Sequence, residues 1–314
     1  MRLPYIMAHL SLCLNQYDEQ YTSLIRTNLR SFHLNLDAGN WNAIQSSLAP
    51  DYYWDYDGTI ILSPPAARAA LQHVAGTLLG GVHAQDIYNI VDGNRGAALF
   101  RITGQQGADF FGVPLQQPPG RYDVRSAERF IFDADGLARE VTTVTPVGLL
   151  KEQMQGAVEI LPAAEVVLKQ SVQTDSTFQG RNRKTLASLH FNVLAGNASA
   201  NELLAAENVQ SDENGVVTTG RDAFAGLISA RNAGLGSFPV KAFHDFDILV
   251  DGMYGAIDYV WAGLQESEYK GIPAKEGANV KVRGMLFFEF NENGLIEKVV
   301  SVYDEGVVAT TLSN

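Results

Sequence analysis

The chain has 314 residues, of which 46% are hydrophobic and 18% charged, and its formal net charge is −12. This composition excludes an intrinsically disordered chain, and the length suits two domains of about 150 residues each. A chain with this negative net charge lacks the basic surface that a nucleic-acid-binding protein needs, so we expect no nucleic-acid partner.

Residues 1–21 form an N-terminal extension whose apolar run is interrupted by Pro4 and His9, so we expect no secretion signal. The one cysteine, Cys13, can form no intramolecular disulfide, and we interpret it as a small buried apolar side chain. No stretch approaches the ~20 apolar residues of a membrane span. These features predict a cytoplasmic protein with no membrane partner.

The first elements along the chain are helical. Apolar spacing predicts a helix over 25–36 that ends at Ala38-Gly39-Asn40, then a short helix over 41–48. The aromatic run at 52–58 is typical of a strand, and a third helix over 64–79 begins with two prolines.

Four strands follow, over 83–91, 97–103, 122–132 and 139–145. Asp92-Gly93 and Asp135-Gly136 are typical of hairpin turns, so the strands form an antiparallel meander. Helices followed by a meander predict an α+β domain in which the sheet curls over the helices to bury its apolar face.

The chain repeats this pattern. Residues 90–114 match 249–273, with Asp92-Gly93 against Asp251-Gly252, and 32–41 resembles 191–198. A period this long indicates two copies of one domain. We predict domain 1 over 22–151, a linker over 152–179 and domain 2 over 180–314. The apolar first part of the linker is expected to pack on the body of the protein.

Three stretches, L-D-A-G-N-W-N-A-I-Q-S-S-L-A-P-D-Y-Y-W-D (36–55), F-F-G-V-P (110–114) and D-G-L-A-R-E-V (135–141), resemble SnoaL-like polyketide cyclases of the nuclear transport factor 2-like superfamily. The resemblance spans residues 22–151 and 180–312. It implies two tandem cone-shaped α+β barrels packed as an internal pseudo-dimer. It also implies one apolar pocket per domain and no metal or organic cofactor.

In those cyclases an acid/base Asp lies seven residues after the turn glycine, and a His lies seven residues before it. Counting from Gly136 gives Thr143 and Arg129, and counting from Gly294 gives Ser301 and Phe287. Neither copy therefore keeps the pair that the resemblance implies, and a hydroxyl can hydrogen-bond a substrate oxygen but is a poor proton shuttle.

The aromatic block at 52–56 supplies our catalytic candidates. Alternation along a strand places either Trp54 and Tyr56, or Tyr53 and Asp55, in the pocket. Asp55 and Tyr56 are predicted catalytic groups, and Trp54 is predicted to stack on a planar substrate. Domain 2 has no aromatic residues in this block, so domain 1 is the preferred site.

The last two strands of domain 1 supply the other candidates. Thr143 and Thr145 share one face, and Arg125 and Arg129 share a face of the preceding strand, where Arg129 could stabilise an enolate catalytically. Alternatively, the arginines pair with Glu128 or Asp123, and Arg125 shares a structural role with Arg283, its match in domain 2. The predicted substrate-binding residues are Trp54, Arg125, Thr143, Thr145, Gln106, Arg283, Ser301 and Tyr303.

These features predict a cofactor-independent cyclase, isomerase or dehydratase acting on a small hydrophobic, polyketide- or terpenoid-like substrate in secondary metabolism. The alternative is a non-catalytic binding or scaffold protein with a degenerate cyclase fold. We expect a monomer that is an internal pseudo-dimer, or a homodimer. We interpret His33 and His73, on predicted helices, as structural residues.

Overall fold

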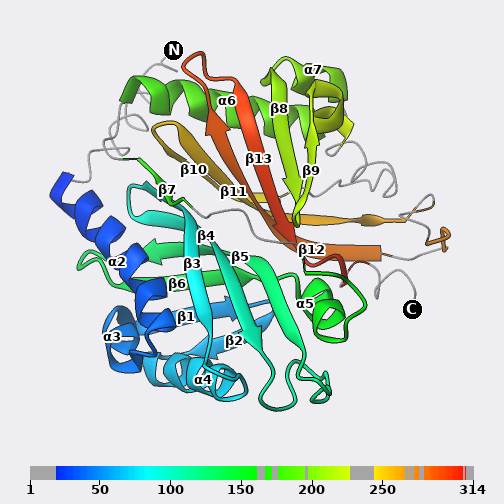
Figure 1. The fold of residues 1–314 in the computed structure, drawn as a ribbon. Coiled ribbons are helices and arrows are strands. Elements are labelled where there is room, and N and C mark those ends of the chain that lie inside the picture. Colours follow the sequence, from blue (N-terminus) through cyan, green and yellow to red (C-terminus); the bar gives the residue numbers. More distant parts are fainter. Residues whose placement is uncertain are drawn as a thin grey trace.

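The computed structural model describes residues 19–160, 167–171, 176–194, 197–226, 244–265, 268, 272–275, 279–306 and 308. Cys13 and nearly all of the N-terminal extension lie outside these residues. The described chain forms two mixed sheets, each with its own helices, stacked one above the other (Figure 1). None of the described helices is long and apolar enough to cross a membrane.

The first half contains more elements than the sequence predicts. Its strands pair in the order β2-β1-β6-β5-β4-β3-β7, and β1 runs parallel to β6. The short strand β2 and the helix α5 were not predicted. In chain order the elements are α2 (Glu19–Asp37), α3 (Trp41–Ser46), β1 (Leu48–Tyr56), β2 (Thr59–Leu62), α4 (Pro64–Gly76), β3 (His83–Asp92), β4 (Arg95–Gln105), β5 (Arg121–Phe132), β6 (Ala138–Val144), α5 (Val147–Met154) and β7 (Lys169–Gln170).

Helices α2 and α4 lie at opposite ends of the first sheet. Helix α2 contacts β3 and β4, whereas α4 contacts β1 and β2. Because the helices lie on one face and touch both ends, the sheet curves around them. The buried side of α2 carries residues at helical spacing, namely Ile25, Leu29, Phe32, His33 and Leu36. One of these five is a histidine, and its position matters below.

The second half repeats this design. Its strands pair in the order β10-β11-β12-β13-β8-β9, and α6, like α2, has 19 residues. The prediction of two tandem α+β units is therefore confirmed. The elements are α6 (Ser176–Leu194), α7 (Ala198–Glu202), β8 (Ala205–Glu213), β9 (Val216–Thr219), β10 (His244–Asp251), β11 (Tyr254–Leu264), β12 (Asn279–Phe290) and β13 (Ile296–Tyr303).

The segment between the two halves is less packed than expected. Val158 and Val167 are 38% and 61% exposed, so these two valines do not pack on the body of the protein. Residues 161–166 lie outside the described part of the chain. The domain limits at 151 and 180 remain predictions. Helix α5 extends beyond the first limit, to Met154, and α6 begins before the second, at Ser176.

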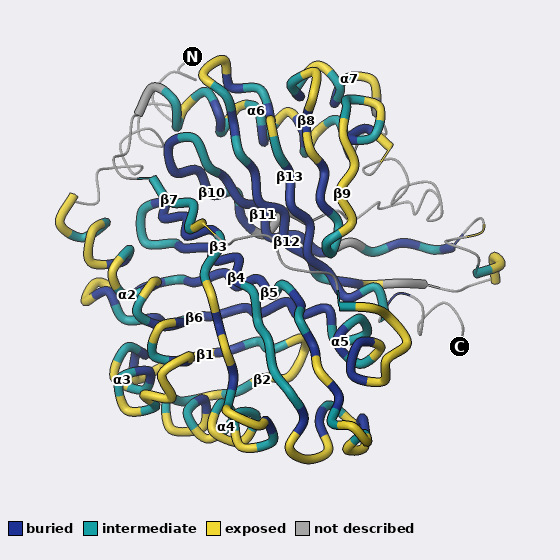
Figure 2. The backbone as a smooth tube through the Cα atoms, in the orientation of Figure 1, coloured by how far each residue is buried: buried dark blue, intermediate teal, exposed yellow. Residues whose placement is uncertain are grey.

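The two sheets pack through the faces that their helices leave open. A buried apolar cluster there draws on both sheets, and Figure 2 shows the strands buried where they meet. We call this contact the domain joint. It confirms the expected internal pseudo-dimer. The joint buries the outer face of each sheet, and the helices of each half already cover the inner face. Its apolar members include Tyr88, Leu99, Ala127 and Val144 from the first half and Leu249, Met285, Phe287 and Val302 from the second.

Candidate active site

Strand β5 has two buried faces, and they differ in what they contact. Phe130 packs with Leu29 in the core beneath the helices, whereas Ala127 packs in the domain joint. Since neighbours alternate along a strand, Glu128 shares the inner face with Phe130. Arg125 and Arg129 share the outer face with Ala127, so they point away from the inside of the first domain.

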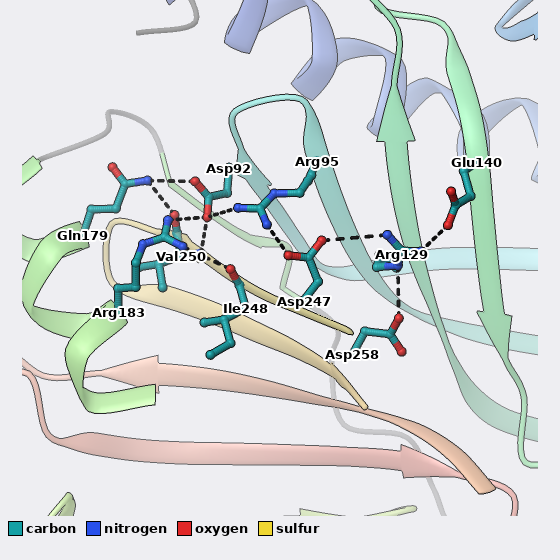
Figure 3. Close-up of polar contacts among 10 residues, drawn as sticks. All are labelled: Asp92, Arg95, Arg129, Glu140, Gln179, Arg183, Asp247, Ile248, Val250 and Asp258. Atoms are coloured by element: carbon teal, nitrogen blue, oxygen red, sulfur yellow. Dashed lines mark hydrogen bonds and ion pairs between the residues drawn. The ribbon is translucent and has the colours of Figure 1, made fainter. Parts of the chain in front are cut away.

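Arg129 neutralises buried carboxylates in the domain joint (Figure 3). Its Nε lies 3.0 Å from Asp258 Oδ2, a terminal guanidinium nitrogen lies 3.8 Å from Asp247 Oδ2, and Glu140 pairs with it from β6. Burial raises the pKa of the fully buried Asp258 carboxyl, and the nearby Arg283 and Arg129 offset part of that rise. This position gives Arg129 a structural role in place of the predicted catalytic one.

Asp55, Arg125 and Arg283 also lie in the joint, in a pair of matching contacts. The Arg283 guanidinium lies 2.7 Å from Asp55 Oδ2, and the Arg125 guanidinium lies 2.5 Å from Asp212 Oδ2. The first contact joins β1 to β12, and the second joins β8 to β5. Each therefore links the first strand of one half to a meander strand of the other. The structural alternative for Arg125 and Arg283 agrees with this arrangement, and Asp55 faces away from the pocket for which it was predicted.

A second matching pair involves the hairpin aspartates. Asp92 accepts a hydrogen bond from Arg183 at 2.5 Å, and Asp251 accepts one from Arg26 at 2.6 Å. Figure 3 shows Asp92 between Arg183, Arg95 and Gln179, and the Val250 backbone N–H donates to the same carboxylate. The hairpin turns therefore also link the helices of one half to the sheet of the other.

The inside of the first domain contains a continuous chain of hydrogen bonds that ends in an ion pair. Trp54 Nε1 donates to Thr143 Oγ1 at 2.8 Å, and Thr143 Oγ1 donates to Glu128 Oε1 at 2.9 Å. Glu128 Oε2 lies 3.2 Å from His33 Nε2, and His33 Nδ1 lies 2.6 Å from Asp86 Oδ1. We call these five residues the His33 cluster. Five elements, α2, β1, β3, β5 and β6, bring it together.

His33 is 1% exposed, yet both of its ring nitrogens face carboxylates. Burial alone would lower the pKa of the imidazole, but Asp86 and Glu128 outweigh burial and raise it to about 10. A pKa in this range favours the imidazolium form, which pairs with Asp86 at Nδ1 and with Glu128 at Nε2. Burial, together with the charge of Glu128, also raises the pKa of the adjacent Tyr52 hydroxyl.

Glu128, His33 and Asp86 are the residues that sequence reasoning missed, and Asp86 was not considered at all. Glu128 was considered only as a partner for an arginine, and His33 was interpreted as structural. The signal lies in strand pairing, because Glu128 stands directly opposite Thr143. Thr143 is the position where the resemblance implies an acid/base Asp, so a carboxylate is present beside that position, on the neighbouring strand.

Of the aromatic block, Trp54 and Tyr56 face inward. Tyr56 packs against Trp54 with ring centroids 5.4 Å apart and stacks with Phe111 at 6.3 Å. Thr145 is buried, with its hydroxyl 2.8 Å from that of Ser126. These three predicted residues line the inner face, as alternation requires if Thr143 points inward.

Gln106 is a structural residue. It is fully buried, and its Oε1 accepts hydrogen bonds from the backbone N–H groups of Gln116 and Gly120, each at 3.2 Å. Its amide nitrogen donates to the Val113 carbonyl. Gln106 thereby holds the loop after β4 in place, and its polar atoms are occupied by backbone groups in place of a substrate.

The second domain keeps part of the pattern without the carboxylate. Ser301 stands opposite Leu286 in the β12–β13 pair, where the first domain has Thr143 opposite Glu128. His190 lies four residues before the end of α6, as His33 does in α2, but burial lowers its pKa. The buried hydroxyl of Tyr303 donates to Glu213.

A cleft of about 420 Å³ meets the His33 cluster at the β3 edge of the first sheet. His33 and Asp86 form part of its wall, so this pair has a route to solvent. Other lining residues come from α2, β3, β4 and Leu168, and include Arg30, Leu34, Asp37, His83, Gln85, Arg101 and Thr103. Among the described residues, no group of three or more His, Cys, Asp or Glu is arranged to hold a metal ion.

No family model and no curated protein matches the chain. Solved structures match about half of it at a time. A protein assigned as a SnoaL-like polyketide cyclase from Jannaschia sp. CCS1 is 16% identical, with a TM-score of 0.40, over 45% of this chain and 97% of its own. An LEH-like epoxide hydrolase from M. tuberculosis is 15% identical over 43% and 92%, with a TM-score of 0.36. A protein with a ketosteroid isomerase-like fold from Catenulispora acidiphila is 11% identical over 41% and 92%, with a TM-score of 0.35.

Proposed function

We propose that the chain is a cofactor-independent enzyme whose reacting groups are the His33 cluster of the first domain. It would isomerise, cyclise or dehydrate a small, largely apolar carbonyl compound, of which polyketide- and terpenoid-like molecules are examples. The observation that carries the proposal is a buried imidazolium held between two carboxylates, with one of those carboxylates on the wall of a cleft.

The arrangement supports proton transfer next to a carbonyl group. Asp86, which lines the cleft, would accept the proton from the carbon beside the carbonyl, and the electron pair of that C–H bond would form the enolate. The positive charge of the His33 ring, whose two nitrogens face Asp86 and Glu128, would stabilise the enolate oxygen electrostatically. Return of the proton to a different carbon gives an isomer. Attack of the enolate on a second carbonyl of the same molecule closes a ring, and the alkoxide that forms takes the proton back from Asp86.

The other members of the cluster would position these two. Glu128 holds His33 in its charged form from the side away from the cleft, and Thr143 and Trp54 fix the Glu128 carboxylate. His33, Asp86 and Glu128 thus replace Asp55 and Arg129 in our assignment, and Tyr56 remains a proposed lining residue. The second domain, with Leu286 at the place of Glu128, would serve as a structural partner.

The test is proton exchange at carbon, which needs no knowledge of the natural substrate. We would follow loss of the α-proton signals of 2-tetralone in D₂O by NMR. The wild-type protein should accelerate exchange, and Asp86→Asn should slow it by about 100-fold or more. Asp51→Asn, at a residue whose side chain is 61% exposed, is the matched control. Equal exchange by the wild-type protein and Asp86→Asn would overturn the assignment.

A binding protein is the second candidate, because one observation favours it. Trp54, Phe110 and Tyr122 are each at most 5% exposed, so aromatic side chains already fill much of the inside of the first domain. A protein of this kind would bind ligands in the cleft with no exchange above the buffer rate. The same measurement therefore distinguishes the two candidates.

A further inference from the structure

The cleft beside the His33 cluster is lined by one face of α2 and by the β3 edge of the sheet. Arg30, His33, Leu34 and Asp37 follow the spacing that places side chains on one side of a helix. On the strands, Gln85 lies opposite Arg101 and His83 lies opposite Thr103, so these four share one face. The cleft is thus a built surface with contributions from three elements.

The acidic groups in and beside this cleft are already engaged. Asp37 Oδ1 accepts from the Ala84 backbone N–H at 3.3 Å and lies 3.2 Å from His83 Nδ1. Asp86 binds His33 through one oxygen and accepts from Asn89 at 2.8 Å through the other. These contacts offset the negative charge of both carboxylates, so neither would strongly repel an anionic ligand.

Arg101 is engaged in the same way. Its guanidinium makes a two-point contact with Asp123 at 2.7 and 2.5 Å, and the hydrogen bond to Asp123 raises its pKa. This arginine is fully neutralised by a neighbour, so it is not the group that would attract a charged ligand. Its role in the cleft is to form part of the wall.

The groups that are left over comprise one donor that carries a positive charge and two neutral groups that can both donate and accept. Within the described part of the chain, Arg30, Gln85 and Thr103 make no side-chain hydrogen bond or ion pair. The exposed guanidinium of Arg30 offers five N–H donors in a planar fork that matches a carboxylate. Beside it, Leu34 and Leu168 supply apolar surface.

From this asymmetry we infer that the cleft binds a keto acid, with the carboxylate on Arg30 and the carbonyl at His33 and Asp86. The inference rests on the proposed function, since it names the substrate class of that site. Arg30 and His33 are separated by about one turn of helix, roughly 5 Å. The acid and the reacting carbonyl therefore belong to one small molecule, a few bonds apart.

Direct binding tests this inference separately from catalysis. The probe is 3-(2-oxocyclohexyl)propanoate, and the comparison is its methyl ester, which keeps the ketone and loses the charge. Calorimetric titration should give a dissociation constant for the acid about tenfold lower than for the ester, because hydrogen bonds to charged groups are worth roughly that ratio. Arg30→Gln should abolish the difference, and Arg30→Lys should keep part of it.

The control is Arg139→Gln, because Arg139 is an exposed arginine outside the cleft whose ion pair is with Asp51. It should leave the preference for the acid unchanged. Equal affinity for acid and ester, or an unchanged preference in Arg30→Gln, overturns the inference. If 2-tetralone exchange depends on Asp86 while acid and ester bind alike, the proposed function stands and the keto-acid inference fails. If the acid is preferred but no exchange occurs, the cleft binds carboxylates and the proposed function fails.

Discussion

The two halves of the chain share one architecture and differ in what they bury. The first half has a charged interior, in which Glu128 stands opposite Thr143. The second has Leu286 opposite Ser301, and its buried carboxylates Asp247 and Asp258 lie in the domain joint. Both halves use charge to hold the two sheets together, but the first also keeps charge inside its own domain, where a substrate could use it.

The largest effect is expected from making the first half resemble the second. Glu128→Leu removes one partner of the buried His33 imidazolium, so we expect the free energy of unfolding to fall by about 3–5 kcal/mol. Urea denaturation monitored by tryptophan fluorescence measures this. A loss below about 1 kcal/mol would contradict the described contact. Glu128→Gln keeps the shape of the side chain and removes its charge, so it separates the effect of charge from that of packing.

Breaking the joint is expected to cost a similar amount without touching the chemistry. Arg129→Leu leaves the buried Asp258 without its closest cation, which costs about 3 kcal/mol or more. The double variant Arg129→Leu/Asp258→Leu should regain much of this loss, because an apolar pair needs no neutralisation. Exchange activity per folded molecule should match the wild type, and its selective loss would restore Arg129 as a catalytic candidate.

The two helix histidines should give opposite pH dependence. The pKa of folded His33 is raised to about 10, so its contribution to stability is complete below the unfolded value near 6.5 and is lost as the pH rises through 10. His190 has a lowered pKa, so its contribution is present above pH 6.5 and is lost on acidification. Denaturation of His33→Gln and His190→Gln from pH 5 to 10 checks both signs. The same slope for both variants would contradict the difference between the halves.

The smallest effect is expected at the surface. Arg139 and Asp51 lie 2.9 Å apart, but their side chains are 60% and 61% exposed. Arg139→Gln should change the free energy of unfolding by less than about 1 kcal/mol, with a small salt dependence. A larger loss would show that exposed pairs also hold this fold together.

The fold was largely accessible from the sequence because its signals are local. Helical spacing, hairpin turns and the match between Asp92-Gly93 and Asp251-Gly252 specified the order of elements in both halves. The strand β2 was missed because it has only four residues and follows β1 after a turn. The helix α5 was missed because it lies at the end of the repeat, in a stretch interpreted partly as linker.

The site was less accessible for a physical reason. Alternation shows which residues share a face, but it does not show which face is the inner one. In most sheets burial decides this, yet here the joint buries the outer face too, so Ala127 and Phe130 are equally buried. Asp55 and Arg129 were therefore placed on the wrong side of their strands. The pairing of His33 with Glu128 joins residues 95 positions apart, which no local pattern reveals.

The contact between Arg129 and Asp258 has a consequence for how such a protein can change. In a dimer of identical subunits every substitution appears on both sides of the axis, so a new charge meets its own copy. Here Phe287 occupies in β12 the place that Arg129 occupies in β5. Fusion of the two copies removes the demand for self-complementarity and makes assembly independent of concentration, so each half can acquire side chains that its twin would not tolerate.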